Sequence, residues 1–123
     1  MTRPPSRKTL VTAVALELLT GLALIVAPGI VIELLLGGAG PGLGPAIGRL
    51  LGIALLTLGM ACWPIQDAGR SSPAFRAMLT YNVLIAGNLA FLGAVEHFSG
   101  YLLWPAVVVH AVLAVLLVWP LRL

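Results

Sequence analysis

The stretch Thr9–Ala27 constrains this chain more than any other feature of its sequence. It stays apolar over about 19 residues, which is the length of helix that crosses the hydrocarbon core of a bilayer. Its one charged residue, Glu17, falls almost at the midpoint of the stretch. A charge at that depth costs about 3 kcal/mol or more, so the sequence predicts a polar partner for Glu17 on another helix.

The rest of the chain is equally apolar. Of the 123 residues, 60% are hydrophobic and 9% are charged, whereas a soluble domain carries about 25% charged residues. The surface of such a chain must therefore face lipid. We predict an all-α fold with one integral membrane domain, residues 1–123, built as a four-transmembrane-helix bundle. The predicted spans cover residues 9–27, 46–63, 74–95 and 101–119, each within a few residues.

The segment after the first span is predicted to be a separate short helix. Pro28 and Gly29 interrupt the first helix, and residues 30–36 that follow are apolar but too short to cross a membrane. We expect this segment to lie at the membrane interface with Glu33 toward water. The alternative is one long kinked helix that reaches Leu36. Residues 37–45 form a turn by composition.

Small residues recur at helical spacing in three of the predicted spans. Such residues let two helix backbones approach closely, either inside one bundle or between two copies of the chain. Both alternatives remain open from the sequence, and packing inside one bundle is the favoured one. The predicted helix-packing positions are Gly44, Gly48, Gly52, Gly59, Ala86, Ala90, Ala106 and Ala114.

Five polar residues in the spans form the candidate functional set. Counted by depth, Glu17 and His110 lie near the midplane, Asn82 lies slightly to the cytoplasmic side, and Arg49 and Asn88 lie in the outer half. One bundle interior would hold all of them as a ligand site or an interhelical polar cluster. Under the first hypothesis, Glu17 forms a structural clip with His110 or Arg49. Under the second, Glu17 and His110 relay a proton or bind a polar headgroup. Arg49 has the further alternative of extending its side chain to the lipid headgroups.

Other chemistries are poorly supported by the residue types present. No Ser/His/Asp set, zinc-ligand set or phosphate-binding glycine loop is visible, so no catalytic or metal-binding residue is predicted. His97 lies roughly 20 Å along the membrane normal from His110, which argues against two histidine ligands on one haem. Cys62 is the single cysteine, and no basic run with interleaved aromatics suggests nucleic acid.

Charge also predicts how the chain is oriented. With four crossings, both termini share one side of the membrane. Cytoplasmic loops carry an excess of Lys and Arg, so the termini are expected to be cytoplasmic and the location to be the inner (plasma) membrane. Trp63, Trp104 and Trp119 fall at predicted span ends, as an aromatic belt requires. The basic residues on the side of the termini are Arg3, Arg7, Lys8, Arg70, Arg76 and Arg122, against Arg49 on the other side.

One stretch resembles a known family. Arg49-Leu50-Leu51-Gly52, continuing to Leu55-Leu56 and Gly59, is similar to the R-x-x-G-x-x-L-L-x-x-G pattern of DoxX-like small four-helix membrane proteins. Glu17, Gly21 and Pro28 also fit, so the resemblance covers about residues 17–59. It implies an association with quinone and with redox partners of the respiratory chain. A glutamate in the first of four spans is also similar to the small multidrug-resistance transporters, from which Trp63 and the histidine of the fourth span depart.

Three functions follow as hypotheses. The first is an accessory or scaffolding subunit, without enzymatic activity, of a larger membrane complex. The second is a small membrane enzyme or a quinone- or lipid-binding protein that uses Glu17, Arg49 and His110. The third is a proton-coupled small transporter. The expected partners are the lipid bilayer and other membrane subunits or further copies of the chain, and no nucleic acid. No cofactor is identified, and a quinone or a lipid is the group that such an interior would accept.

Overall fold

The computed structural model describes residues 7–38, 42–63 and 73–118, and every element within these ranges is a helix. The prediction of an all-α chain is therefore confirmed. Three of the helices, α1, α3 and α4, are long and apolar enough to cross a membrane. The last, α5, is also apolar but has 16 residues. The helices are α1 (Arg7–Val26), α2 (Pro28–Leu36), α3 (Leu43–Ala61), α4 (Pro73–Ala94) and α5 (Leu103–Val118).

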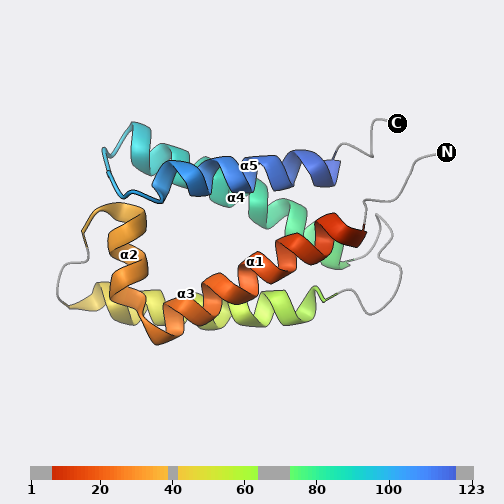
Figure 1. The fold of residues 1–123 in the computed structure, drawn as a ribbon, viewed down its shortest axis with the longest axis horizontal. Coiled ribbons are helices and arrows are strands. Elements are labelled where there is room, and N and C mark those ends of the chain that lie inside the picture. Colours follow the sequence, from red (N-terminus) through yellow and green to blue (C-terminus); the bar gives the residue numbers. More distant parts are fainter. Residues whose placement is uncertain (1–6, 39–41, 64–72, 119–123) are drawn as a thin grey trace.

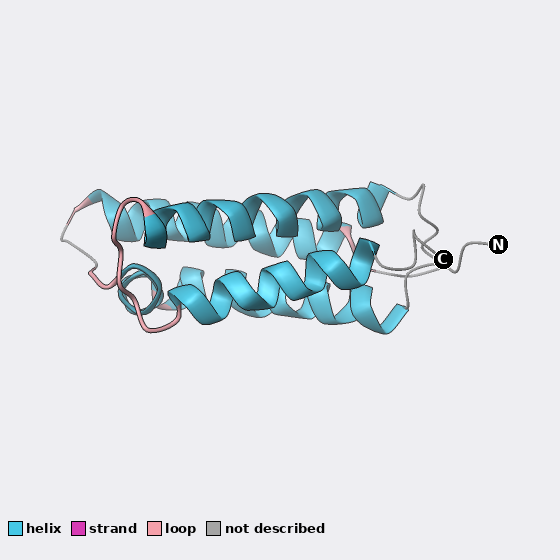
Figure 2. Ribbon diagram, turned by 90° about the horizontal axis from the view of Figure 1, so that it is seen from above, coloured by secondary structure: helices cyan, strands magenta, loops and turns pink. Residues whose placement is uncertain are grey.

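Helices α1, α3, α4 and α5, called the four long helices below, run antiparallel in chain order, and α2 lies across one end of them (Figure 1). A view turned by 90°, from above, looks onto the α4–α5 pair and shows α2 nearly along its axis (Figure 2). One layer pairs α1 with α3, the other pairs α4 with α5, and these two pairs make the most extensive contacts. The start of α1 and the end of α5 lie together at the end away from α2.

The α1–α3 pair is close because two glycines face each other. A Cβ atom added to Gly52 would lie 2.7 Å from the carbonyl oxygen of Gly21, and one added to Gly21 would lie 2.8 Å from the carbonyl oxygen of Gly52. Both distances are shorter than van der Waals contact, so any side chain at either position would push the backbones apart. Gly21 follows Glu17 by one helical turn, so this contact also fixes the part of α1 that carries the carboxylate.

The other predicted packing positions differ in how much they are used. Gly48 packs against Pro28 and Ile32 of the neighbouring helix, and Gly59 packs against Leu18. Gly44 faces open space. The alanines are buried or half-buried: Ala86, Ala90, Ala106 and Ala114. The glycines of α3 that pack thus do so inside one chain, on α1 and α2.

The first helix ends where its hydrogen-bond ladder is interrupted. Ala27 leaves helical geometry, with φ −138° and ψ 63°, and Pro28 has no N–H to donate. Arg49 compensates from α3, because its Nε donates to the carbonyl oxygen of Ile25 over 3.3 Å. The segment after this break is the separate helix α2, with Glu33 exposed, and not a continuation of α1 to Leu36.

Helix α2 ties the two layers together. The N–H of Leu102, just before α5, donates to the carbonyl oxygen of Leu34 over 2.8 Å. Gly100 is buried against the same end of α2, where an added Cβ would collide with the backbone carbonyls of Leu34 and Leu35. The chain between α4 and α5 can therefore cross the end of α2 only because position 100 has no side chain.

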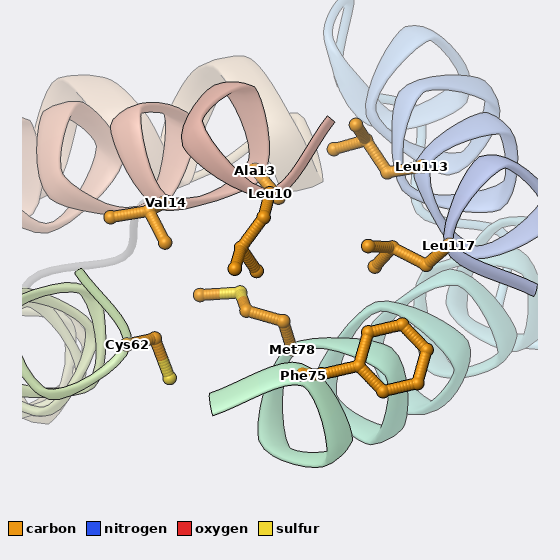
Figure 3. Packing of buried hydrophobic residues seen from close by; sticks show 8 residues of the cluster. All are labelled: Leu10, Ala13, Val14, Cys62, Phe75, Met78, Leu113 and Leu117. Atoms are coloured by element: carbon orange, nitrogen blue, oxygen red, sulfur yellow. The ribbon is translucent and has the colours of Figure 1, made fainter. Parts of the chain in front are cut away.

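An apolar core joins the four long helices at the opposite end (Figure 3). All four contribute to it, α3 through the residue that follows its last turn. Cys62 is that residue, and its free thiol is buried as a small apolar group. The members are Leu10, Ala13, Val14, Cys62, Phe75, Met78, Leu113 and Leu117.

Candidate functional site

Glu17 is the most unusual side chain in the described part of the protein. It lies at the middle of α1, and no part of it is exposed. Both of its carboxylate oxygens are buried without a hydrogen-bond partner among the described residues. Buried polar groups are nearly always paired, since an unpaired one loses its hydration and gains nothing in return. An orphaned pair of carboxylate oxygens therefore requires a specific explanation.

His110 and Asn82 lie beside this carboxylate. His110 Nδ1 is 3.8 Å from Glu17 Oε1 and 2.9 Å from Asn82 Oδ1. Asn82 is fully buried, and its Nδ2 donates to the carbonyl oxygen of Met78 over 2.8 Å. The imidazole of His110 thus makes its hydrogen bond to Asn82, while Glu17 stands next to the same nitrogen at a distance too long for a hydrogen bond.

The hydrogen bonds of Asn82 assign the proton on the His110 ring. Because Asn82 Nδ2 donates to Met78, Oδ1 is the atom turned toward His110, and Oδ1 is an acceptor. His110 Nδ1 must then carry the hydrogen and donate it. In a neutral ring this leaves Nε2 without a proton and able to accept one.

Tyr81 completes the surroundings of the pair. Its ring packs edge-on against the imidazole of His110, with centroids 5.9 Å apart and planes at 79°. Its hydroxyl lies near the Glu17 carboxyl group without meeting hydrogen-bond geometry. Sequence reasoning did not place Tyr81 in the candidate set. The available signal was its position next to Asn82, which puts a hydroxyl-bearing aromatic at the middle of a predicted span.

The three central residues share one depth. Glu17, Asn82 and His110 each lie within about two residues of the midpoints of α1, α4 and α5. The side chain of Glu17 is 0% exposed, whereas that of His110 is 12% exposed. The imidazole is therefore the part of the site that the surroundings can reach, and the carboxylate lies behind it.

Two of the five predicted residues lie elsewhere. Arg49 is exposed and bonded to the end of α1, so it does not neutralise Glu17. Asn88 is exposed on α4. Within the ranges that the structure describes, no group of three His, Cys, Asp or Glu side chains converges as a metal site would require.

A shallow groove of about 340 Å³ lies at the α2 end of the molecule, away from this cluster. It combines apolar side chains with the exposed carboxylate of Glu33. Its lining shares no residue with the Glu17 cluster. The lining residues are Ile30, Glu33, Leu34, Gly37, Ser99, Gly100 and Tyr101.

Comparison with protein families, curated proteins and solved structures finds no match for this chain. The similarity to DoxX-like proteins over residues 17–59 therefore rests on the sequence pattern alone.

Proposed function

We propose that this chain is a small membrane protein that takes up and releases a proton at the middle of the bilayer, through Glu17 and His110. The observation that carries the proposal is the Glu17 carboxylate, fully buried with neither oxygen hydrogen-bonded and 3.8 Å from His110 Nδ1. The proton would travel alone or on a small polar ligand, such as a hydroxyl- or amine-bearing headgroup.

The geometry favours this function over a structural clip. A clip holds two helices together by a hydrogen bond, and the bond between α4 and α5 is already made by Asn82 and His110. Glu17 takes no part in it. An ionised carboxylate in this position would be costly without a counter-charge, so Glu17 is stable when it carries a proton or when His110 is charged. A group that needs one of these two states is suited to exchange a proton.

The tautomer of His110 suggests a route. A proton that arrives from outside binds Nε2, and the ring then carries two protons and a positive charge. The proton on Nδ1 can then pass to Glu17 Oε1, which leaves a neutral ring and a neutral carboxylic acid. The distance of 3.8 Å must shorten by about 1 Å for this step, within the reach of side-chain rotation.

The proposal includes four membrane crossings, with α5 as the fourth. Its 16 described residues span about 24 Å, close to the hydrocarbon thickness of about 30 Å. Arg7, Lys8 and Arg76 lie in the first turns of α1 and α4, at one end of the molecule, while Arg49 lies near the start of α3, at the other. This asymmetry supports cytoplasmic termini; Arg3, Arg70 and Arg122 lie outside the described residues.

The accessory-subunit hypothesis has less support from the site. It requires a surface for a partner, and the exposed apolar side chains of α3 and α5 are equally suited to lipid. It also leaves the two orphaned oxygens of Glu17 without a role.

A membrane-permeant carbodiimide tests the proposal directly, because it modifies protonated carboxyl groups in apolar surroundings. The purified protein in liposomes should be labelled at Glu17, with labelling that falls as the pH is raised across about pH 5 to 9. Glu33→Gln is the matched control, because Glu33 is exposed and its loss should leave the labelling unchanged. A Glu17 that is never labelled, or labelled equally at every pH, contradicts proton exchange.

Proton movement is the second measurement. Glu17→Gln keeps the size and hydrogen bonding of the side chain but cannot ionise, so it should abolish pH-driven proton uptake into the liposomes while the protein stays folded. His110→Gln should have the same effect, and the double variant should be no worse than either single one. Full proton uptake by folded Glu17→Gln would return Glu17 to a structural role.

A further inference from the structure

Asn88 is an exposed polar side chain within a predicted membrane span, and it has no hydrogen bond in the described structure. Two other exposed polar side chains, those of Thr12 and Thr57, are satisfied within their own helices. Thr12 donates to the carbonyl oxygen of Lys8 over 2.8 Å, and Thr57 donates to that of Ile53 over 2.9 Å. The amide of Asn88 makes no such bond, so its hydrogen-bonding groups face outward from the bundle.

The depth of Asn88 makes this exposure costly. The residue lies between four and five positions beyond the midpoint of α4, or about 7 Å along the helix axis. The hydrocarbon core extends about 15 Å to each side of its centre. The short side chain of asparagine therefore ends among lipid tails, where no water is available for its donors and acceptor. Such a group is expected to find a partner on another helix.

We propose that the partner is Asn88 of a second copy of this chain, in a dimer that packs α4 against α4. An asparagine amide carries both donors and an acceptor, so two such amides related by a two-fold axis satisfy each other. The neighbouring Gly87 has nothing within 4 Å of an added Cβ, which leaves room for a second backbone. Leu84 and Phe91 are exposed on the same side of α4 and would border the contact.

The depth also decides the orientation of the two copies. In a parallel dimer, with the two-fold axis along the membrane normal, both Asn88 side chains lie at the same level. In an antiparallel dimer each would lie about 7 Å from the midplane on opposite sides, so the two amides would be separated by about 14 Å. Only the parallel arrangement pairs them.

The glycines of α3 do not offer an alternative surface for a contact between two copies. Gly48, Gly52 and Gly59 are all occupied by contacts with α1 and α2 of the same chain. The α4 surface is therefore the better candidate for a contact between copies. This inference is independent of the proton site, because Asn88 does not contact Glu17 or His110.

Energy transfer between labelled copies in liposomes, measured over a range of protein-to-lipid ratios, tests the dimer. The wild-type chain should dimerise, and Asn88→Leu should weaken the dimer by roughly 3- to 30-fold, the range expected for interhelical hydrogen bonds in membranes. Asn88→Gln should retain most of the affinity. Thr57→Val is the matched control, because Thr57 is exposed but already bonded within α3. Circular dichroism should show that every variant is folded.

Cysteine cross-linking tests the orientation separately. In a Cys62→Ala background, Leu84→Cys should form disulfide-linked dimers with itself on oxidation, and Leu50→Cys on the exposed side of α3 should not. A chain that stays monomeric at all lipid ratios would overturn the proposal. So would a dimer whose affinity is unchanged by Asn88→Leu, or one that cross-links through α3 instead of α4.

Discussion

Replacement of single glycines in α3 by alanine should separate two contributions to stability, the close contact between helices and the helix propensity of the residue. A Cβ added to Gly52 would lie 2.7 Å from the Gly21 carbonyl oxygen and 2.9 Å from Leu24 Cβ. Ordinary contact begins at 3.4 Å, so the α1 and α3 backbones would have to part by about 0.7 Å. The atoms that collide belong to backbone or Cβ positions, which no side-chain rotation can move.

The expected magnitude follows from two opposing effects. Overpacking costs about 1–3 kcal/mol. Because the contact at Gly52 is with rigid backbone, the overpacking cost of Gly52→Ala should be about 3 kcal/mol. Alanine recovers about 1 kcal/mol through its greater helix propensity. The net loss in the free energy of unfolding should therefore be about 2 kcal/mol for Gly52→Ala.

Two further variants calibrate this value on the same helix. At Gly59 the added Cβ comes within 3 Å only of side-chain atoms of Leu18, Cδ2 at 2.6 Å and Cγ at 2.8 Å, and this side chain can rotate away. A cost of about 1 kcal/mol should then be cancelled by helix propensity, so that Gly59→Ala is close to neutral. Gly44 faces open space, and Gly44→Ala should stabilise the protein by about 0.5 kcal/mol.

The assay is unfolding by SDS in mixed detergent micelles, followed by far-ultraviolet circular dichroism. The expected order of stability is Gly44→Ala above wild type, Gly59→Ala near wild type and Gly52→Ala well below it. If Gly52→Ala were as stable as Gly44→Ala, α1 and α3 would not be in backbone contact at this point, and the position of Glu17 derived from that contact would be wrong.

Three more outcomes are expected from the same unfolding measurement. Arg49→Gln should cost about 1 kcal/mol, because an exposed bond to Ile25 is lost, and a loss several times larger would mean that Arg49 neutralises a buried acid. Gly100→Ala should cost about 3 kcal/mol or more, since the Cβ collides with the backbone of α2; a wild-type stability would exclude that docking. Asn82→Leu should cost about 1–3 kcal/mol, because His110 loses its buried acceptor, and His110→Leu in the same background should then cost less than it does alone.

The helical character of the described ranges and the separate helix α2 follow from the sequence because they depend on local properties. The predicted turn over residues 37–45 is too long, since α3 already begins at Leu43. Apolar length predicts the helices. A proline has no N–H to donate, so it interrupts the hydrogen bonds of a helix in any context, and α2 begins at Pro28. Residue counting likewise places Glu17 and His110 at one depth, and their side chains lie 3.8 Å apart in the structure.

The parts of the site that sequence reasoning did not place depend on rotation and pairing. Depth alone allowed Arg49 and Asn88 to face the interior, but helix rotation turns both outward. The partner of Arg49 is the backbone carbonyl of Ile25 at the end of α1. Every residue carries such a carbonyl, so the sequence does not show which one accepts a hydrogen bond from a side chain. Tyr81 joins the site because α4 presents it to the His110 ring, which only the α4–α5 pairing reveals.

The pairing of neighbours in the chain has a consequence for how the protein is made. Since α1 packs mainly on α3, and α4 mainly on α5, each hairpin can form as soon as its second helix has been synthesised. Glu17 belongs to the first hairpin, whereas His110 belongs to α5, the second helix of the other hairpin. In a chain that crosses the membrane as proposed, the carboxyl group would enter the bilayer before its neighbour, and the neutral acid would be its less costly form there. On the proposed arrangement, protonation of Glu17 would therefore precede its enclosure by the completed bundle.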